Sequence, residues 1–218
     1  MIDADSGSRR PGPRSDVDVR DLILDTAEAM VGDSSPDAVS MRAVARGAGV
    51  APRAVVHHFP TKDALLDAII LRRGVGSNAS VKQNLLALTT ADEPPSIRDV
   101  VSAVLSPILD VINADPVPGV RWLRVFSARS GALGLAWTLS MSADAELPVL
   151  VYELAEQSLA DAEPGAMTRF PIAMSQMVDT LGRLDQPIFG LPLTGSGVDP
   201  EFVEQLLVLT CAGIVGRI

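Results

Sequence analysis

Apolar side chains recur along this chain mainly at intervals of three and four residues, the spacing that places them on one face of an α-helix. The clearest stretch runs from residue 97 to residue 112. Its apolar positions are Ile97, Val100, Val101, Val104, Leu105, Ile108, Leu109 and Ile112. Ser96 and Asp99 have the spacing of a helix N-cap and the residue that bonds back to it, whereas Pro107 predicts a kink or a break.

The same spacing predicts helices over most of the remaining chain, so the expected fold class is all-α. Composition agrees, since 47% hydrophobic but only 4% aromatic residues suit helices rich in Ala, Leu and Val. Gly74, Gly76 and Ser77 are expected to weaken or bend the helix that starts at Thr61. The further helices are expected at about 15–30, 61–73, 143–162, 167–184 and from residue 200 onward.

Between residues 40 and 69 the helix and turn signals are dense. Ser40 is a good N-cap for a short helix, and Gly49 can take the positive φ that a sharp turn between two helices requires. Pro52 suits the first turn of a second short helix, and Thr61 is a cap for the next one. Two short helices joined by a glycine turn form a helix-turn-helix, an arrangement found in DNA-binding proteins.

This segment is basic, whereas the rest of the chain is acidic. Residues 38–62 contain Arg42, Arg46, Arg53 and Lys62 but no Asp or Glu, so they carry +4 within a chain of net charge -9. The remainder therefore carries -9 minus +4, or -13. Phosphate groups are attracted to the segment and repelled by the remainder, which favours a localised DNA-binding surface over ordinary solvated charges.

The segment resembles the DNA-binding domain of the tetracycline-repressor (TetR) family, whose pattern runs roughly T-x-x-x-I-A-x-x-A-G-V-S-x-x-x-L-Y-x-H-F-x-x-K-x-x-L. The matching or conservative residues are Ser40, Val44, Ala45, Ala48, Gly49, Val50, Val55, His58, Phe59, Lys62 and Leu65. Ala51 replaces a small hydroxyl cap of the family, and Val56 replaces a tyrosine that reaches a DNA phosphate. The resemblance covers about residues 16–75.

The resemblance implies both a domain arrangement and partners. It implies an N-terminal three-helix helix-turn-helix DNA-binding domain at 15–75 and a C-terminal helical ligand-binding and dimerisation domain at 76–218. Residues 1–14, rich in Ser, Gly, Pro and Arg, are expected to form a disordered arm. In the family the last two long helices pair with those of a second copy, so a homodimer is expected on a roughly palindromic double-stranded DNA operator.

Side chains on and around the second short helix are the expected DNA contacts. Arg42 and Arg53 are the candidates for guanine, because a guanidinium fork matches the O6 and N7 acceptors of that base. The full set of expected base contacts is Arg42, Ala51, Pro52, Arg53 and Ala54, and His57 is expected to reach either a base or a phosphate. The expected contacts with the sugar-phosphate backbone, which fix the register, are Ser40, His58, Thr61 and Lys62.

Bulky, adaptable side chains gather in the middle third of the chain, as an apolar pocket for a small-molecule effector requires. They are Trp122, Phe126, Trp137, Met141, Tyr152, Phe170, Met174 and Met177. The same stripes also fit a plain hydrophobic core, so both interpretations stay open. Arg121, Arg124 and Arg129 are expected to meet either an anionic group of such a ligand or solvent.

Other classes of function have little support in the sequence. The two histidines, His57 and His58, lie inside the basic segment, and no metal-binding, nucleotide-binding or hydrolase motif is present. We therefore expect no enzyme activity, no metal and no cofactor. The N-terminal residues contain no apolar run typical of an export signal, and the apolar runs are too short to span a membrane, so a cytoplasmic location is expected.

The sequence thus favours a DNA-binding transcriptional regulator, more specifically a repressor that a small apolar effector releases from a palindromic operator. The alternative is a TetR-like ligand-binding or protein-interaction module that has lost DNA recognition. Val56 and the net charge of -9 motivate this alternative.

Overall fold

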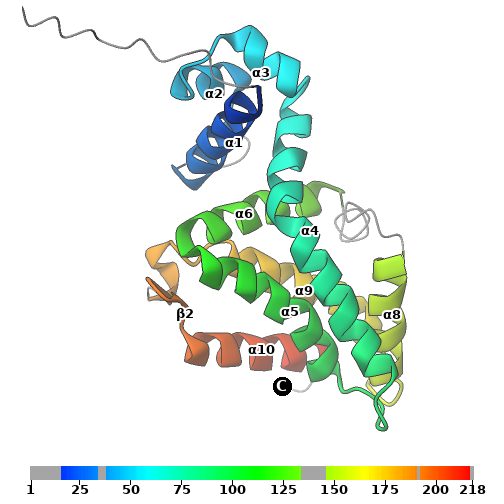
Figure 1. Cartoon of the computed structure of the whole chain (residues 1–218). Coiled ribbons are helices and arrows are strands. Elements are labelled where there is room, and N and C mark those ends of the chain that lie inside the picture. Colours follow the sequence, from blue (N-terminus) through cyan, green and yellow to red (C-terminus); the bar gives the residue numbers. More distant parts are fainter. Residues whose placement is uncertain (1–15, 34–37, 134–145, 191, 217–218) are drawn as a thin grey trace, which may run out of the picture.

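The computed structural model describes residues 16–33, 38–133, 146–190 and 192–216, and confirms the expected all-α class (Figure 1). A single short hairpin pairs β1 (Leu193–Thr194) with β2 (Gly197–Val198) within these residues, and η2 (Pro187–Phe189) is a 3-10 turn. The α-helices are α1 (Asp16–Asp33), α2 (Met41–Gly47), α3 (Pro52–His58), α4 (Lys62–Thr89), α5 (Ile97–Ala114), α6 (Pro116–Leu133), α8 (Glu146–Ser158), α9 (Ala166–Leu181) and α10 (Pro200–Val215).

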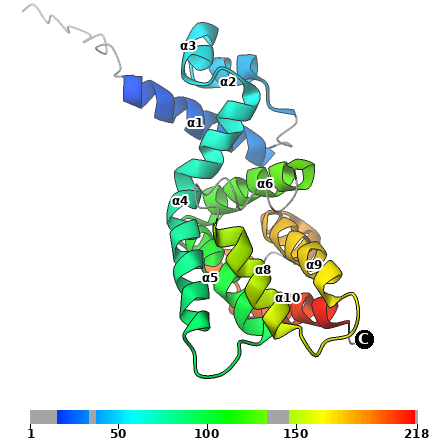
Figure 2. The same ribbon diagram turned by 90° about the vertical axis from the view of Figure 1, so that its right-hand side faces the viewer.

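The helices form two groups that α4 connects (Figures 1 and 2). We call residues 16–73, which hold α1 to α3 and the start of α4, the head. We call residues 74–216 the body. Helix α6 lies directly beneath the head and packs against both α1 and α4, while α10 lies at the far end of the body.

Each group is organised around buried aliphatic side chains that the helical spacing brings together. In the head, α1 buries Ile23, Leu24 and Ala27 against the short helices. In the body, the face of α5 recognised in the sequence is buried almost throughout. Burial of this kind contributes about 25 cal/mol for each Å² of apolar surface removed from water, so the apolar spacing accounts for the assembly of the helices.

Helix α4 differs from the sequence expectation, because Gly74, Gly76 and Ser77 do not end it. It continues unbroken to Thr89. Glycine inside a helix costs about 1 kcal/mol relative to alanine, but packing offsets that cost here. Gly74 is buried, and the Trp122 ring of α6 packs over it, 3.6 Å from the position of an added Cβ atom, which is an ordinary contact distance. The boundary proposed at residues 75 and 76 therefore falls inside a continuous helix.

Helix α5 is also unbroken, although Pro107 lies within it. Proline has no amide hydrogen to donate to the carbonyl four residues earlier, which is that of Ala103. In this structure the side-chain amide of Asn84 on α4 donates to the Ala103 carbonyl at 3.3 Å. A neighbouring helix thus supplies the missing donor, which is why the proline does not split α5.

The last two long helices pack against each other, and Arg169 on α9 holds the end of α10. Its guanidinium donates to the carbonyls of Ile214 and Val215 at 2.9 and 3.0 Å. Asp199 caps the start of α10 by accepting from the Glu201 amide at 3.0 Å, with Pro200 in the first turn as predicted. Among the described helices, none has the length and hydropathy that crossing a membrane requires.

Candidate nucleic-acid interface

Helices α2 and α3 form the helix-turn-helix that the sequence predicts. The Ala43 amide donates to the Ser40 hydroxyl at 3.2 Å, which caps α2, and Gly49 has φ +63° in the turn. Pro52 occupies the first turn of α3, whereas its N-cap residue, Ala51, makes no side-chain capping bond. Thr61 caps α4 by accepting from the Ala64 amide at 3.0 Å. The capping residues expected for these helices are confirmed.

Helix α3 is held by a narrow buried face that leaves the remainder outside. Val55 is its buried residue, and Phe59, which directly follows the helix, is also buried. The Arg20 guanidinium of α1 lies 5.3 Å from the Phe59 ring centroid, a cation-π contact that adds a link to α1. Gly47 ends α2 so close to α1 that an added Cβ atom would lie 2.6 Å from Met30 Cε. The orientation of α3 is therefore set by packing within the head.

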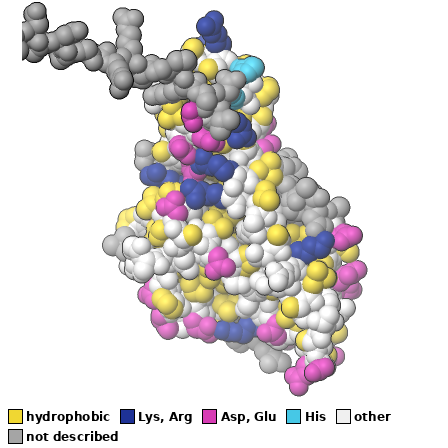
Figure 3. Space-filling model, viewed as in Figure 1, with side chains coloured by type: hydrophobic (Ala, Val, Ile, Leu, Met, Phe, Trp, Pro, Cys, Tyr) yellow, Lys and Arg dark blue, Asp and Glu magenta, His cyan; other side chains and the backbone are white. Residues whose placement is uncertain are grey.

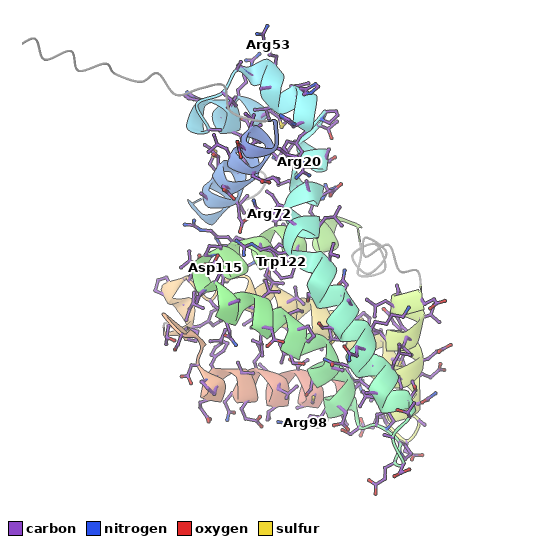
Figure 4. All side chains as sticks on the ribbon, viewed as in Figure 1. Arg20, Arg53, Arg72, Arg98, Asp115 and Trp122 are labelled. Atoms are coloured by element: carbon purple, nitrogen blue, oxygen red, sulfur yellow. The ribbon has the colours of Figure 1, made fainter. Side chains whose placement is uncertain are left out.

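The residues predicted to contact DNA lie at the free end of the head. Those exposed are Ser40, Arg42, Ala51, Pro52, Arg53, His57 and Thr61, and those half-buried are Ala54, His58 and Lys62. Arg53 points away from the rest of the chain at the outermost point of the head (Figure 4). These placements bring the predicted set onto one accessible end, and its contacts with DNA stay predictions.

Val56 lies on the same exposed side of α3, with 52% of its surface accessible. An exposed valine has no hydroxyl with which to reach a phosphate, so the contact that the family's tyrosine makes is lost here. A methyl-bearing side chain in this position can still pack against a thymine methyl group or a deoxyribose.

Charge separates this end of the molecule from the opposite end. Lys, Arg and His side chains lie at the top of the head and further Lys and Arg side chains at its junction with the body, whereas Asp and Glu side chains predominate at the lower end of the visible face of the body (Figure 3). A polyanion approaching the molecule is thus drawn to the helix-turn-helix and repelled from the far end of the body.

The predicted effector residues are divided between a small cavity and the core. A cavity of about 40 Å³ lies between α4, α5, α6 and α8, and Trp122 and Phe126 contribute to its wall. Its full lining is Ile70, Leu71, Gly74, Ser77, Asn78, Val81, Val104, Ile108, Trp122, Phe126 and Leu147. Most of these residues are apolar, and Asn78 and Ser77 are the polar exceptions.

The other predicted effector residues do not line this cavity. Phe170, Met174 and Met177 are buried on α9, and the Tyr152 and Phe170 rings meet edge to face with centroids 5.8 Å apart. Tyr152 on α8 thus packs against α9, and the three α9 side chains lie in the core, in line with the core interpretation of the sequence. Trp137 and Met141 lie outside the described residues.

Two of the three arginines expected to face a ligand or solvent are instead tied to other helices. Arg124 donates to the Gly182 carbonyl at 3.0 Å and pairs with Asp185. Arg129 pairs with Asp63 at 2.7 Å and with Asp67 at 3.1 Å, both on α4. That expectation was wrong for Arg124 and Arg129, because carboxylates distant in sequence are brought beside them by the fold.

A buried carboxylate on α1 was missed in the sequence. Glu28 is only 3% exposed and pairs with Arg73 at 3.0 Å and with Arg72. Arg73 also pairs with Asp115, just before α6, at 3.4 Å. The group is labelled in part in Figure 4. The adjacent arginines in α4 could have indicated an acidic partner in the sequence, since neighbouring guanidinium groups require such partners when they are partly buried.

Among the described residues, no group of three His, Cys, Asp or Glu side chains is placed to hold a metal ion. The His57 and His58 rings lie against each other, with centroids 5.2 Å apart, at the exposed end of α3. That position suits contact with an approaching polyanion.

Comparison with known proteins agrees with this geometry. Residues 23–69 match the family model described as bacterial regulatory proteins, tetR family. A TetR family transcription regulator from Marinobacter aquaeolei VT8 is 15% identical with a TM-score of 0.56, over 91% of this chain and 96% of that chain. AmtR from Mycobacterium smegmatis is 20% identical with a TM-score of 0.55, over 94% of this chain and 88% of that chain. No curated protein matches the sequence.

Proposed function

We propose that this chain, whose residues 23–69 match the TetR family model, is a homodimeric transcriptional repressor released from a palindromic operator by a small apolar effector. The observation that carries the proposal is the exposed, basic helix-turn-helix at the end of an otherwise acidic molecule. In the complex, α3 of each protomer lies in a major groove of double-stranded DNA.

Base recognition is assigned mainly to two arginines. Arg53 at the tip of α3 and Arg42 on α2 are both exposed and carry the guanidinium fork that fits guanine. Lys62 and the capping residues Ser40 and Thr61 contact phosphates instead, which fixes the register without reading sequence. Since Val56 lacks the phosphate contact of the family's tyrosine, these side chains bear a larger share of the affinity.

Dimerisation is assigned to the last two long helices. Both expose apolar side chains on their outer surfaces: Ile172 on α9 is 55% exposed, and Val208 and Leu209 on α10 are 45% and 70% exposed. Apolar surface left on the outside of two adjacent helices is best covered by the same surface of a second copy. A dimer of this kind presents two α3 helices to two half-sites.

The size and position of the cavity support the proposed release of DNA by an effector. Its volume of about 40 Å³ is well below the roughly 300–1,000 Å³ of typical small-molecule pockets, so a ligand must separate its walls. Those walls include α4 and α6, and α4 carries the head. An apolar effector that enlarges the cavity therefore moves the head and disfavours the DNA-bound arrangement.

A gel-shift titration tests the proposal against the alternative of a module without DNA recognition. The probe is the DNA upstream of the protein's own coding sequence, at low and at moderate salt. The repressor predicts retardation that is selective for sequence and weakens as salt rises. An absence of retardation at every salt concentration would support the alternative instead.

A further inference from the structure

The seam between α4 and α6 consists of matching stripes at helical spacing. On α6, Trp122, Phe126 and Arg129 stand four and three residues apart and thus share one face. On α4, the residues that meet them include Asp63, Asp67, Ile70 and Gly74 at the same kind of spacing. One continuous face of α6 therefore faces one continuous face of α4.

Contacts change in character along this seam. At the body end, the Trp122 indole donates to the Ile70 carbonyl at 3.0 Å and lines the cavity. At the head end, the Arg129 guanidinium joins Asp63 and Asp67 through its two terminal nitrogens. The Arg129 side chain is 16% exposed and the Asp67 side chain 29%, so solvent screens their contact less than the contact with Asp63, which is 70% exposed.

Arg129 contacts α4 next to the proposed DNA-binding surface, so it can influence the placement of that surface. Asp63 lies in the first turn of α4, next to Lys62 and Thr61, and α4 directly follows the helix-turn-helix. A fork that holds two carboxylates one turn apart fixes the rotation of α4 about its axis as well as its distance from α6. The direction in which the head projects from the body then depends on this contact.

We propose that Arg129 is a positioning residue that sets which spacing of two DNA half-sites the dimer accepts. The inference rests on the proposed function. Adding one base pair moves the second half-site by about 3.4 Å along the axis and rotates it by roughly 35°. A head held at a fixed angle discriminates against such a change, whereas a head free to pivot tolerates it. Base preference within each half-site belongs to α3 and does not depend on Arg129.

Binding of the full-length dimer to a set of duplexes tests the inference. Each duplex carries the same two selected half-sites, separated by the preferred spacer or by a spacer one or two base pairs longer or shorter. For the unmodified protein we expect about tenfold weaker binding when the spacer changes by one base pair, comparable to the effect of a mismatched base. For Arg129→Gln the same change is expected to cost threefold or less, with unchanged base preference in each half-site.

Three further variants make the result specific. Asp67→Asn, which removes one acceptor from the α4 side, should flatten the spacing profile in the same direction. Arg129→Lys keeps the charge but loses the guanidinium fork. Its spacing profile should therefore fall between those of the unmodified protein and Arg129→Gln. Lys82→Gln removes one positive charge from a contact with Glu146 at 3.1 Å, on the same helix α4 but at its body end, and should leave the profile unchanged.

Two results would overturn the inference in ways that can be told apart. If the unmodified protein selects half-sites but binds every spacing equally well, or if folded Arg129→Gln and Asp67→Asn retain tenfold discrimination, Arg129 does not set the spacing although DNA recognition stands. If the unmodified protein selects no sequence at all, the proposed function fails and the inference fails with it. Thermal unfolding of each variant establishes that the compared proteins are folded.

Discussion

The head and the body use similar apolar packing inside but differ in what they leave exposed. Helix α3 in the head buries Val55 and exposes Arg53 and His57 together with Pro52 and one larger apolar side chain, Val56. Helix α10 in the body buries Leu206, Leu207, Thr210 and Ile214 and exposes Val208 and Leu209. The difference is in line with the two proposed partners, a charged polymer for the head and the apolar surface of a second copy for the body.

The largest expected effect concerns the proposed dimer surface of the body. Leu209→Asp places a charge in the centre of the proposed dimer surface, and we expect dimer dissociation to become at least about 30-fold more favourable, equivalent to roughly 2 kcal/mol. Sedimentation velocity measures this. Val149→Asp is the matched control, since Val149 is another exposed apolar residue, 55% exposed and located on α8. This variant should leave the dimer intact. Equal dissociation of both variants would show that the surface lies elsewhere.

On the head's side, Arg53→Ala removes the guanidinium at the tip of α3. Binding to the preferred operator should weaken by roughly 1–3 kcal/mol, with relaxed preference at one base pair in each half-site. A binding titration against operators substituted at each position gives both quantities. An unchanged operator preference would mean that Arg53 does not read a base.

Inside the body, Asn84→Ala tests the link between α4 and α5. The substitution leaves the Ala103 carbonyl without its donor, since Pro107 supplies none, and should lower the free energy of unfolding by about 1–2 kcal/mol. Urea denaturation measures the change. Gln83→Ala, an exposed residue next to it, is the control. A loss no greater than that of the control would show that the contact contributes nothing to stability.

The N-terminal cap of α5 contributes to the stability of the body, and the size of this contribution depends on pH. Hydrogen bonds from the Ser96 hydroxyl and backbone amide lower the pKa of Asp99. Because the pKa of Asp99 is lower in the folded state, its stabilising contribution is fully present at pH values above the ordinary pKa of 3.8. This contribution is lost as the pH falls through the folded-state pKa. Asp99→Asn should therefore destabilise the protein at pH 7 by about 1 kcal/mol or less, and the deficit should shrink in acid.

Urea denaturation between pH 7 and pH 3 checks this dependence. Asp110→Asn, an exposed aspartate further along α5, removes the same charge away from the cap. If both variants lose stability equally, or if the deficit of Asp99→Asn does not change with pH, the capping bond is not its cause.

The smallest expected effect returns to the head. Lys62→Ala removes one phosphate contact, so it should weaken binding to all sequences alike and reduce the slope of log affinity against log salt by about one. Anisotropy titrations on operator and unrelated DNA over a range of salt concentrations measure the slope. A selective loss on the operator alone would assign Lys62 to base recognition instead.

Local signals in the sequence were sufficient to predict the helix caps and the turn of the head. The caps at Ser40 and Thr61, the positive φ at Gly49 and the first-turn Pro52 all concern neighbouring residues, and the structure has each of them. The caps of α5 and α10 follow for the same reason. Such features depend on backbone geometry over three or four residues, which the sequence displays directly.

Features that depend on residues distant in the chain could not be read in this way. The Trp122 ring of α6 packs at Gly74 of α4, and the Ala103 carbonyl of α5 accepts from Asn84 of another helix. Glu28 stands at a position of α1 with no local sign that it is buried. The effector residues were grouped by chemical type in the sequence, but the fold separates Trp122 and Phe126 at the cavity from the α9 side chains in the core.

Selective binding to DNA through α3 is the central claim, and the ratio of two dissociation constants tests it most directly. A site selected by the protein from a pool of random duplexes and a scrambled duplex of the same length are titrated at the same salt concentration. The account predicts that the selected site binds at least about 1,000-fold more tightly. Equal affinity for the two duplexes, or no binding to either at low salt, would contradict it.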